Sequence, residues 1–195
     1  MEDEQRKIQR SYPQTVTLAN NTTLTLRLMT PADSHRIVTF ARSLPEDDLL
    51  FLRTDITKAF VVMLWGQNIK AGLTVTVLAE REQEVVGYAS MHHNEVSWQR
   101  HLGELRVQVG PHYRSRGLGR ILAAEIFAIA RDMGLRKIVA HMTPDQQGAI
   151  ATVKRYGFEQ EALLRDFVID RVGRTRDLMV MTCDVARLVT GEEIG

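Results

Sequence analysis

The sequence has a single cysteine, Cys183, so no internal disulfide can form. It also lacks a CxxC motif or a cysteine–histidine cluster with zinc-site spacing, and we expect no metal. Its longest apolar run, residues 59–65, is far shorter than the ~20 residues of a membrane-spanning helix. These absences favour a protein in a reducing, cytoplasmic setting without a membrane contact.

No charge of one sign dominates, because 25 Lys and Arg face 24 Asp and Glu, for a formal net charge of +1. Such a surface has no general field for nucleic acid, so we expect no nucleic-acid partner, and an anionic ligand must be held locally. Repeats, low-complexity segments and interdomain linkers are also lacking. A chain of 195 residues can bury a substantial core as one domain. We expect a flexible N-terminal segment at 1–21, one domain at 22–186 and a C-terminal tail at 187–195, with the oligomeric state open.

Hydrophobic periodicity and turn residues predict the secondary structure. Alternating or β-rich segments predict strands at residues 22–28, 73–79, 84–92, 102–109, 137–142, 158–163 and 176–184. Three- and four-residue spacings and capping residues predict helices at residues 31–43, 55–68, 118–133 and 144–156. Antiparallel hairpins together with one strand–helix–strand unit predict an α/β (α+β) fold: a mixed sheet of six to seven mostly antiparallel strands with about four helices on its faces.

The most informative segment is residues 114–120, between a clean strand and the strongest amphipathic helix. Gly117 and Gly119 let a ligand approach the backbone, while the amides of the first helical turn and the helix dipole favour phosphate oxygens. Three arginines add positive charge: Arg114, Arg116 and Arg120. A dinucleotide fingerprint would need glycine at Leu122, and a P-loop would need Gly-Lys-Ser or Gly-Lys-Thr. The segment therefore predicts a phosphate-binding loop of another type.

This loop and its strand resemble the signature of the GNAT superfamily of N-acetyltransferases. That signature is Val-x-Val on a strand, then Arg or Gln, two residues, Gly, one residue, and Gly or Ala. It is met here by Val107-Gln108-Val109 and Arg114-Ser115-Arg116-Gly117-Leu118-Gly119. The likeness covers roughly residues 24–185, including Ala149-Ile150 and Tyr156-Gly157-Phe158. A further segment, residues 170–178, resembles the acetyltransferase domains of bacterial protein-lysine acetyltransferases.

The resemblance implies a GNAT-like fold and transfer of acetyl from acetyl-CoA to a primary amine by direct attack. The acceptor would be a protein lysine or a small amine. The pantetheine arm would lie along residues 107–109, the pyrophosphate on the amides of residues 114–120, and an amide at or near Val109 would stabilise the oxyanion. The implied acetyl-CoA ligands are Val107, Gln108, Val109, Arg114, Ser115, Arg116, Gly117, Leu118, Gly119, Arg120 and Gln146.

Direct attack needs a base, because a lysine-type amine has a pKa of about 10.4 and is mostly protonated at neutral pH. Glu104 is the candidate, since it lies on the polar face of its strand and resembles a glutamate used as base by histone-type and related bacterial members. The alternative is a solvated charge paired with Arg106. A tyrosine that protonates the thiolate in many members corresponds to Val153, so the general acid is unassigned. That departure motivates an alternative function, a non-catalytic acyl-CoA-binding sensor or regulatory module.

The remaining candidates have two interpretations each. Gln146 corresponds to a family asparagine that contacts the cofactor, and it is also suited to a capping box with Thr143. Substrate contact is possible for the histidines and tryptophans, but a structural or packing role is the expectation for His92, His93, Tyr156, Cys183, Trp65 and Trp98.

Overall fold

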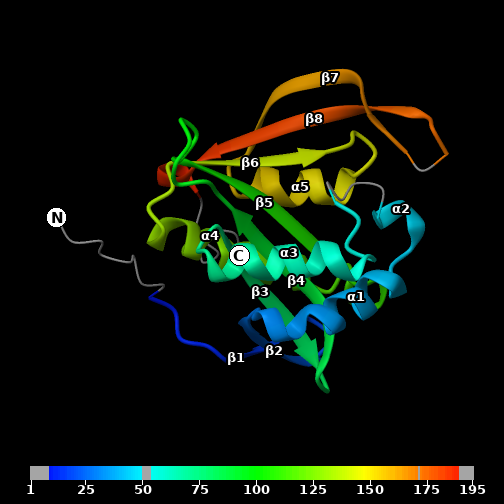
Figure 1. Ribbon diagram of the computed structural model, residues 1–195, viewed down its shortest axis with the longest axis vertical. Coiled ribbons are helices and arrows are strands. Elements are labelled where there is room, and N and C mark those ends of the chain that lie inside the picture. Colours follow the sequence, from blue (N-terminus) through cyan, green and yellow to red (C-terminus); the bar gives the residue numbers. More distant parts are fainter. Residues whose placement is uncertain (1–8, 50–53, 171, 189–195) are drawn as a thin grey trace.

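The computed structural model describes residues 9–49, 54–170 and 172–188. Residues 1–8 of the expected N-terminal segment and 189–195 of the expected tail lie outside this description. Within it, one sheet of eight strands has the order β1-β2-β3-β4-β5-β6-β8-β7 (Figure 1). The strands are β1 (Gln14–Thr17), β2 (Thr23–Leu28), β3 (Thr74–Arg81), β4 (Glu84–His92), β5 (Leu102–Val109), β6 (Lys137–Met142), β7 (Glu159–Ile169) and β8 (Thr175–Asp184).

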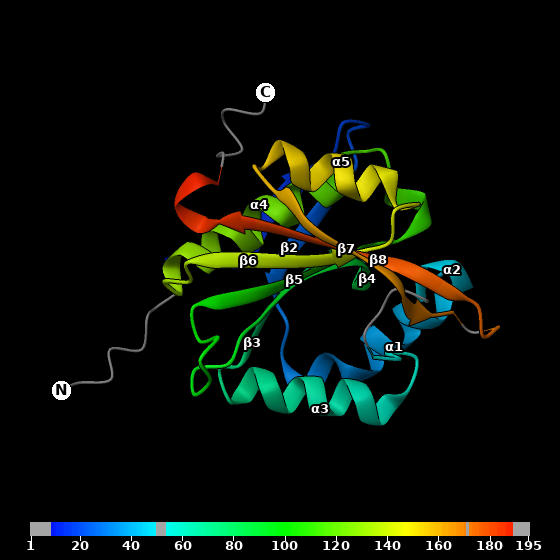
Figure 2. The same ribbon diagram turned by 90° about the horizontal axis from the view of Figure 1, so that it is seen from above.

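Helices cover both faces of this sheet. They are α1 (Ser34–Ser43), the single turn α2 (Glu46–Leu49), α3 (Ala59–Lys70), α4 (Leu118–Asp132) and α5 (Gln147–Arg155). Figure 2 shows α1 and α3 on one side of the sheet and α4 and α5 on the other. Two apolar clusters fill the layers, one under α1 and α3 and a larger one under α4 and α5. In the described part of the chain, none of the helices has the length and apolar character needed to cross a membrane.

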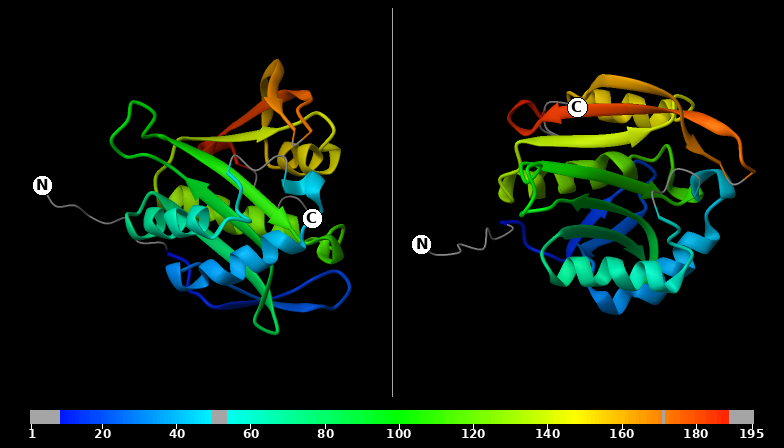
Figure 3. Two further views of the ribbon diagram at one scale, coloured as in Figure 1. Left: turned by 45° about the vertical axis from the view of Figure 1, so that its right-hand side comes forward. Right: turned by 45° about the horizontal axis from the view of Figure 1, so that its top comes forward.

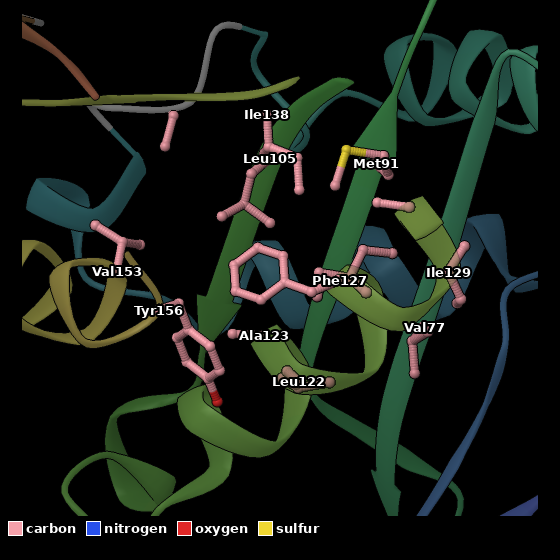
Figure 4. Packing of buried hydrophobic residues seen from close by; sticks show 14 of the residues in the cluster. Val77, Met91, Leu105, Leu122, Ala123, Phe127, Ile129, Ile138, Val153 and Tyr156 are labelled. Atoms are coloured by element: carbon pink, nitrogen blue, oxygen red, sulfur yellow. The ribbon is translucent and has the colours of Figure 1, made fainter. Parts of the chain in front are cut away.

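The larger cluster fixes α4, the helix that follows the predicted phosphate loop. Its members include Leu105 of β5, Ile138 of β6 and Phe127 of α4, all buried. Figure 4 shows Phe127 pointing toward Tyr156, and the two ring centroids are 4.9 Å apart in an edge arrangement. Burying aromatic rings in such a contact stabilises the layer beyond area burial alone. Strand β5 and helix α4 are therefore held by one core.

The predicted mixed fold is confirmed, with more strands than the predicted six to seven. The additional strand is β1, a four-residue strand that pairs antiparallel with β2. Its turn is closed by hydrogen bonds from the Leu18 amide to the Thr22 carbonyl (2.9 Å) and from the Asn21 amide to the Leu18 carbonyl (2.9 Å). Asn21 has φ 62°, a left-handed conformation that asparagine tolerates well. A strand this short was overlooked inside the segment expected to be flexible.

Two predicted helices begin later than expected. The helix predicted from residue 55 starts at Ala59, because Asp55 forms a turn in which its side chain accepts from the Thr57 amide at 3.0 Å. The helix predicted from residue 144 starts at Gln147. Here residues 143–146 form a turn closed by the Gln146 amide and the Thr143 carbonyl at 3.0 Å. Both starts are shifted by local side-chain and turn hydrogen bonds that compete with the helix.

The N-terminal segment is attached to α4 through a buried carboxylate. Glu125 accepts a hydrogen bond from Arg10 at 2.5 Å and one from the Tyr12 hydroxyl at 2.9 Å. Burial, followed by the neighbouring Glu125, raises the pKa of Tyr12 well above its usual value. Because Glu125 is only 7% exposed, these two partners offset the cost of burying its charge. Residues 9–17 are therefore held against the helix.

A second ion network joins α1 to the sheet. Arg27 of β2 donates to both carboxylate oxygens of Asp33, at 2.8 and 2.5 Å, and to Glu80 of β3 at 2.5 Å. Arg36 of α1 lies 2.7 Å from the same Glu80 oxygen. The Thr30 amide and hydroxyl also donate to Asp33, at 2.9 and 3.0 Å. This network fixes the start of α1 over β2 and β3.

Candidate active site

Strands β5 and β6 separate part way along their length, and this separation creates the site. They are the parallel pair of the sheet, and their pairing runs from Leu102↔Lys137 to Leu105↔Ala140. β5 continues to Val109 and stays paired with β4 as far as Gly87↔Val109. Figures 1 and 3 show β6 diverging from β5 beyond the paired part, with the β7–β8 hairpin continuing on the far side of β6. The backbone edge of residues 106–109 is therefore released from β6.

A cavity of about 660 Å³ occupies this separation. It is lined by β5, the loop after it, the start of α4, the end of β6 and the start of α5. The structure brings these predicted site residues to its wall: Glu104, Val107, Gln108, Val109, Arg114, Ser115, Gly117, Gly119, Arg120 and Gln146. Arg116 and Leu118 do not line it: Arg116 is exposed and its carbonyl accepts from the Ala19 amide at 3.3 Å, while Leu118 is fully buried in the core.

The loop has the conformation expected of a phosphate cradle. Ser115 and Gly117 have φ 56° and 91°, so the chain turns sharply before α4 and presents amides toward its N-terminus. A Cβ on Gly117 would meet nothing within 4 Å, and one on Gly119 would meet only Val109 Cγ2 at 3.7 Å. Both glycines therefore border open space rather than packed protein. The cavity, the loop and the helix start fit the diphosphate of a nucleotide-type cofactor.

Arg114 connects the loop to the end of β5. Its Nε donates to the Val109 carbonyl at 3.1 Å, and its guanidinium also bonds Asp48 of α2. In a regular strand the N–H and C=O of one residue point to the same side. The Val109 amide therefore faces the loop and the cavity, where it can donate to a ligand.

Glu104 lies at the point where the strands begin to separate. Its Oε1 accepts from Arg106 Nε at 3.2 Å and Nη2 at 3.1 Å, and it lies 4.0 Å from Nδ1 of His141 on β6. The Glu104 side chain is 20% exposed, so it is partly desolvated while still reachable. Glu104 pairs with Arg106, as the alternative interpretation expected, and it also lines the cavity, while its role as base stays a prediction.

Glu104 faces the α1 and α3 side of the sheet. It is paired in register with His92 of β4, and paired residues share a face. The His92 ring lies 6.2 Å from the ring of Trp65 on α3, which places that face under α3. The phosphate loop instead leads into α4 on the opposite face. The gap between β5 and β6 connects the α1 and α3 face of the sheet with the α4 face.

Two further residues, His141 and Asp48, line the cavity beside the predicted site and were not predicted from the sequence. His141 approaches Glu104 only because β5 and β6 are parallel neighbours, and Asp48 reaches Arg114 from α2, which is far away in sequence. The alternation of residues 137–142 was visible in the sequence, but the register that places His141 near Glu104 was not. No local pattern linked Asp48 to the loop.

The other candidates lie mainly in structural positions. Gln146 lines the cavity, and its Oε1 accepts from the Thr143 amide at 3.0 Å, which is half of the expected capping box. Tyr156 is buried and its hydroxyl donates to the Arg120 carbonyl at 2.9 Å, and burial raises its pKa. Burial also raises the pKa of Cys183, which is a core residue as expected. Val153, the position that the family resemblance matches to a tyrosine, lines the cavity.

The two tryptophans behave differently. Trp65 is buried and donates to Thr76 Oγ1 at 3.2 Å, as a packing role requires. The packing expectation for Trp98 is wrong, because this side chain is 87% exposed. It lies in the β4–β5 connection, beyond the reach of either apolar cluster.

Comparison with known proteins identifies related chains. The family model described as "Acetyltransferase (GNAT) family" matches residues 41–158. Mycothiol acetyltransferase from Rhodococcus jostii (strain RHA1) is 30% identical over 92 residues, which are 46% of this chain and 30% of that protein. The chain thus spans less than a third of this curated relative.

Solved structures share the fold over most of the chain. Ribosomal-protein-alanine N-acetyltransferase from Brucella melitensis is 27% identical with a TM-score of 0.70, covering 82% of this chain and 98% of that one. The yncA protein from Salmonella typhimurium, solved with its cofactor acetyl-CoA, is 22% identical with a TM-score of 0.73, covering 84% of this chain and 95% of that one.

Proposed function

Because this chain belongs to the acetyltransferase (GNAT) family, which confirms the resemblance seen in its sequence, we propose that it acetylates a primary amine by direct attack with Glu104 as base. It is an acetyltransferase, and acetyl-CoA is its acyl donor. One observation carries the proposal: the cavity between β5 and β6 is bordered by a phosphate-type loop toward α4 and by Glu104 on the opposite face. Acetyl-CoA therefore binds from the α4 face of the sheet, and the amine acceptor approaches from the face that carries Glu104.

The chain supplies the parts that bind and orient the donor. The pyrophosphate lies against the amides of residues 114–120, where Arg120 and the start of α4 add positive potential. Pantetheine runs along residues 106–109, whose edge β6 has released, and pairs with it as an added strand would. The Val109 amide then donates to the thioester oxygen as negative charge develops there.

Proton transfer takes place on the face of the sheet that carries Glu104, opposite α4. Glu104 removes a proton from the bound ammonium, directly or through one water, and the neutral nitrogen attacks the thioester carbon. The carbon–sulfur bond breaks, the second nitrogen proton passes to solvent or to the departing sulfur, and CoA leaves as a thiolate, a tolerable leaving group by comparison with cysteine, whose thiol pKa is about 8.5. Val153 carries no proton to give, and Tyr156 donates to the Arg120 carbonyl, so no side chain serves as acid in this scheme. Arg106 and His141 orient the Glu104 carboxylate.

The acceptor is a primary amine whose identity requires a direct assay. Among relatives, one is named for the alanine of a ribosomal protein and another for mycothiol. The panel should therefore contain a peptide with a free α-amine, a lysine peptide blocked at its N-terminus, a polyamine and an amino sugar conjugate. Titration calorimetry with acetyl-CoA and free CoA, followed by thiol release with each amine, tests the proposal.

Replacing Glu104 by Gln is the decisive variant. We expect kcat to fall about 10²- to 10⁴-fold, the range typical of a lost general base, while the Kd for acetyl-CoA changes less than twofold. Glu84→Gln, an exposed carboxylate at the β3–β4 turn, is the matched control and should leave both values unchanged. Unaltered turnover in the Glu104 variant would remove the base assignment, and absence of acetyl-CoA binding by the parent protein would remove the cofactor assignment.

A further inference from the structure

A second cavity, of about 1070 Å³, lies at the end of the sheet away from the candidate active site. The β4–β5 connection, the turn from α4 to β6 and the short helix after β8 meet there, at the left of Figure 1. Its wall is formed by Trp98, Arg100, His101, Arg131, Leu135, Arg136, Lys137, Asp184, Val185 and Ala186. None of these residues lines the acetyl-CoA cavity.

Cations outnumber carboxylates in this wall. Four of the chain's cations, Arg100, Arg131, Arg136 and Lys137, face a single carboxylate, Asp184. Lys137 lies 3.3 Å from Asp184 and 3.8 Å from Glu161, which stands outside the wall, so Lys137 is neutralised and the three arginines carry the positive charge. In a chain whose formal net charge is +1, such a concentration is a local positive field, and it favours an anion carrying more than one negative charge.

The backbone fixes the spacing of these cations. The amides of Arg136 and Lys137 both donate to the His101 carbonyl, at 2.9 and 3.2 Å. Arg131 is held on the other side by its bond to the Leu188 carbonyl at 2.7 Å. Arg100 and Arg136, both exposed, are therefore presented from two joined segments. A planar guanidinium can donate two parallel hydrogen bonds to two oxygens of one phosphate.

Trp98 gives the wall an aromatic surface. Its side chain is 87% exposed, whereas Trp65 is 8% exposed. An indole on the surface is a platform for a flat ring, and stacking of a nucleobase on an aromatic side chain strengthens binding with little dependence on the base. The wall thus combines a stacking surface with arginines.

We propose that this cavity binds a nucleoside phosphate. Arg100 and Arg136 contact the phosphate oxygens, and the base stacks on Trp98. The volume is sufficient for such a ligand, since small-molecule sites commonly measure about 300–1,000 Å³. This site is separate from the acetyl-CoA cavity and its existence does not depend on the catalytic proposal.

The test is calorimetric titration of the full chain with ATP and GTP in the presence of saturating acetyl-CoA, so that the first cavity is filled. Parallel titrations use tripolyphosphate and the free nucleosides. We expect both nucleotides to bind and to quench tryptophan fluorescence, with tripolyphosphate and nucleosides at least about tenfold weaker, since each has one of the two features.

Variants locate the site. Arg100→Gln combined with Arg136→Gln should weaken nucleotide binding at least about twentyfold, and Trp98→Ala, which removes the stacking surface, should weaken it about tenfold and remove the quenching. Arg81→Gln, an exposed arginine at the β3–β4 turn, is the control and should change affinity less than twofold. Gly119→Glu, which blocks the acetyl-CoA cavity, should leave nucleotide binding intact.

Three results would overturn the proposal. One is the absence of heat and quenching at millimolar nucleotide. Another is tripolyphosphate binding as tightly as ATP, which would leave Trp98 without a role. The last is loss of nucleotide binding in the Gly119 variant, which would place the nucleotide in the acetyl-CoA cavity.

Discussion

Replacing Asp33 by Asn should destabilise the protein by about 3 kcal/mol at pH 7. The Asp33 side chain is 7% exposed and accepts hydrogen bonds from Arg27, Thr30 and Arg36. Its charge is therefore largely removed from water and is compensated by these three partners. Removing one member of a buried ion pair costs about 3–5 kcal/mol, and the lower end applies because Glu80 stays paired with Arg27. For a chain of this size, 1 kcal/mol shifts Tm by about 2–4 °C, so Tm should fall by roughly 6–12 °C.

The pH dependence of this loss identifies its cause. Hydrogen bonding from Arg27 is the main reason that the pKa of Asp33 lies far below its usual value. A lowered pKa stabilises the folded state above the unfolded pKa of about 3.9, and this stabilisation is lost as the pH falls through the folded pKa. The difference between wild type and the Asn variant should therefore be constant from pH 7 to about pH 5 and shrink below about pH 4.

Urea unfolding followed by tryptophan fluorescence measures this difference, since Trp65 is buried. Glu84→Gln serves as the control carboxylate and should change the unfolding free energy by less than about 0.5 kcal/mol. A loss below about 1 kcal/mol at pH 7, or a loss that is the same at pH 3 and pH 7, would refute the reasoning.

Three further substitutions probe the site and its support. Gly119→Glu places a carboxylate in the phosphate loop and should weaken acetyl-CoA binding at least about 100-fold by calorimetry with the fold intact by circular dichroism; retained affinity would contradict the loop assignment. Tyr156→Phe removes the bond to the Arg120 carbonyl and should cost about 1 kcal/mol in urea unfolding while kcat stays within twofold, whereas a large fall in kcat would indicate an acid role. Gly103→Ala sets a Cβ 2.4 Å from Met91 Sδ and 2.7 Å from Leu135 Cδ1, so overpacking should cost about 1–3 kcal/mol in the same assay, and a neutral result would show that the core yields there.

Much of the fold followed from the sequence because strong local patterns coincide with elements. The bounds predicted for β5 and β6 agree with the structure, since apolar residues recur at every second position, at 105, 107 and 109 in β5 and at 138, 140 and 142 in β6. α4 begins and ends where its apolar spacing and Gly134 indicated, and Gly134 has φ 64° just past the helix. The short strand β1 and the single turn α2 carry too few residues for a periodic signal.

Candidate site residues that lie close together in the sequence could be predicted, whereas those brought together only by the fold could not. The loop at 114–120 and Glu104 could be proposed because motif and alternation are local, and residues of both line the cavity. His141, Asp48 and the basic wall around Arg136 depend on which strands are neighbours and on their register, which no short window contains. Trp98 was expected in the core because tryptophan is usually largely buried, and only the course of the β4–β5 connection shows its exposure.

The short pairing between β5 and β6 also sets the mechanics of the sheet. Four register pairs, from Leu102↔Lys137 to Leu105↔Ala140, join β6, β8 and β7 to the first five strands. A joint this short resists bending less than the six-pair contact between β4 and β5. Opening motions should therefore concentrate at this joint, and amide exchange should be faster at its end near Leu105 than in the middle of β4. We therefore expect β6, β8 and β7 to move against the first five strands about residues 102–105.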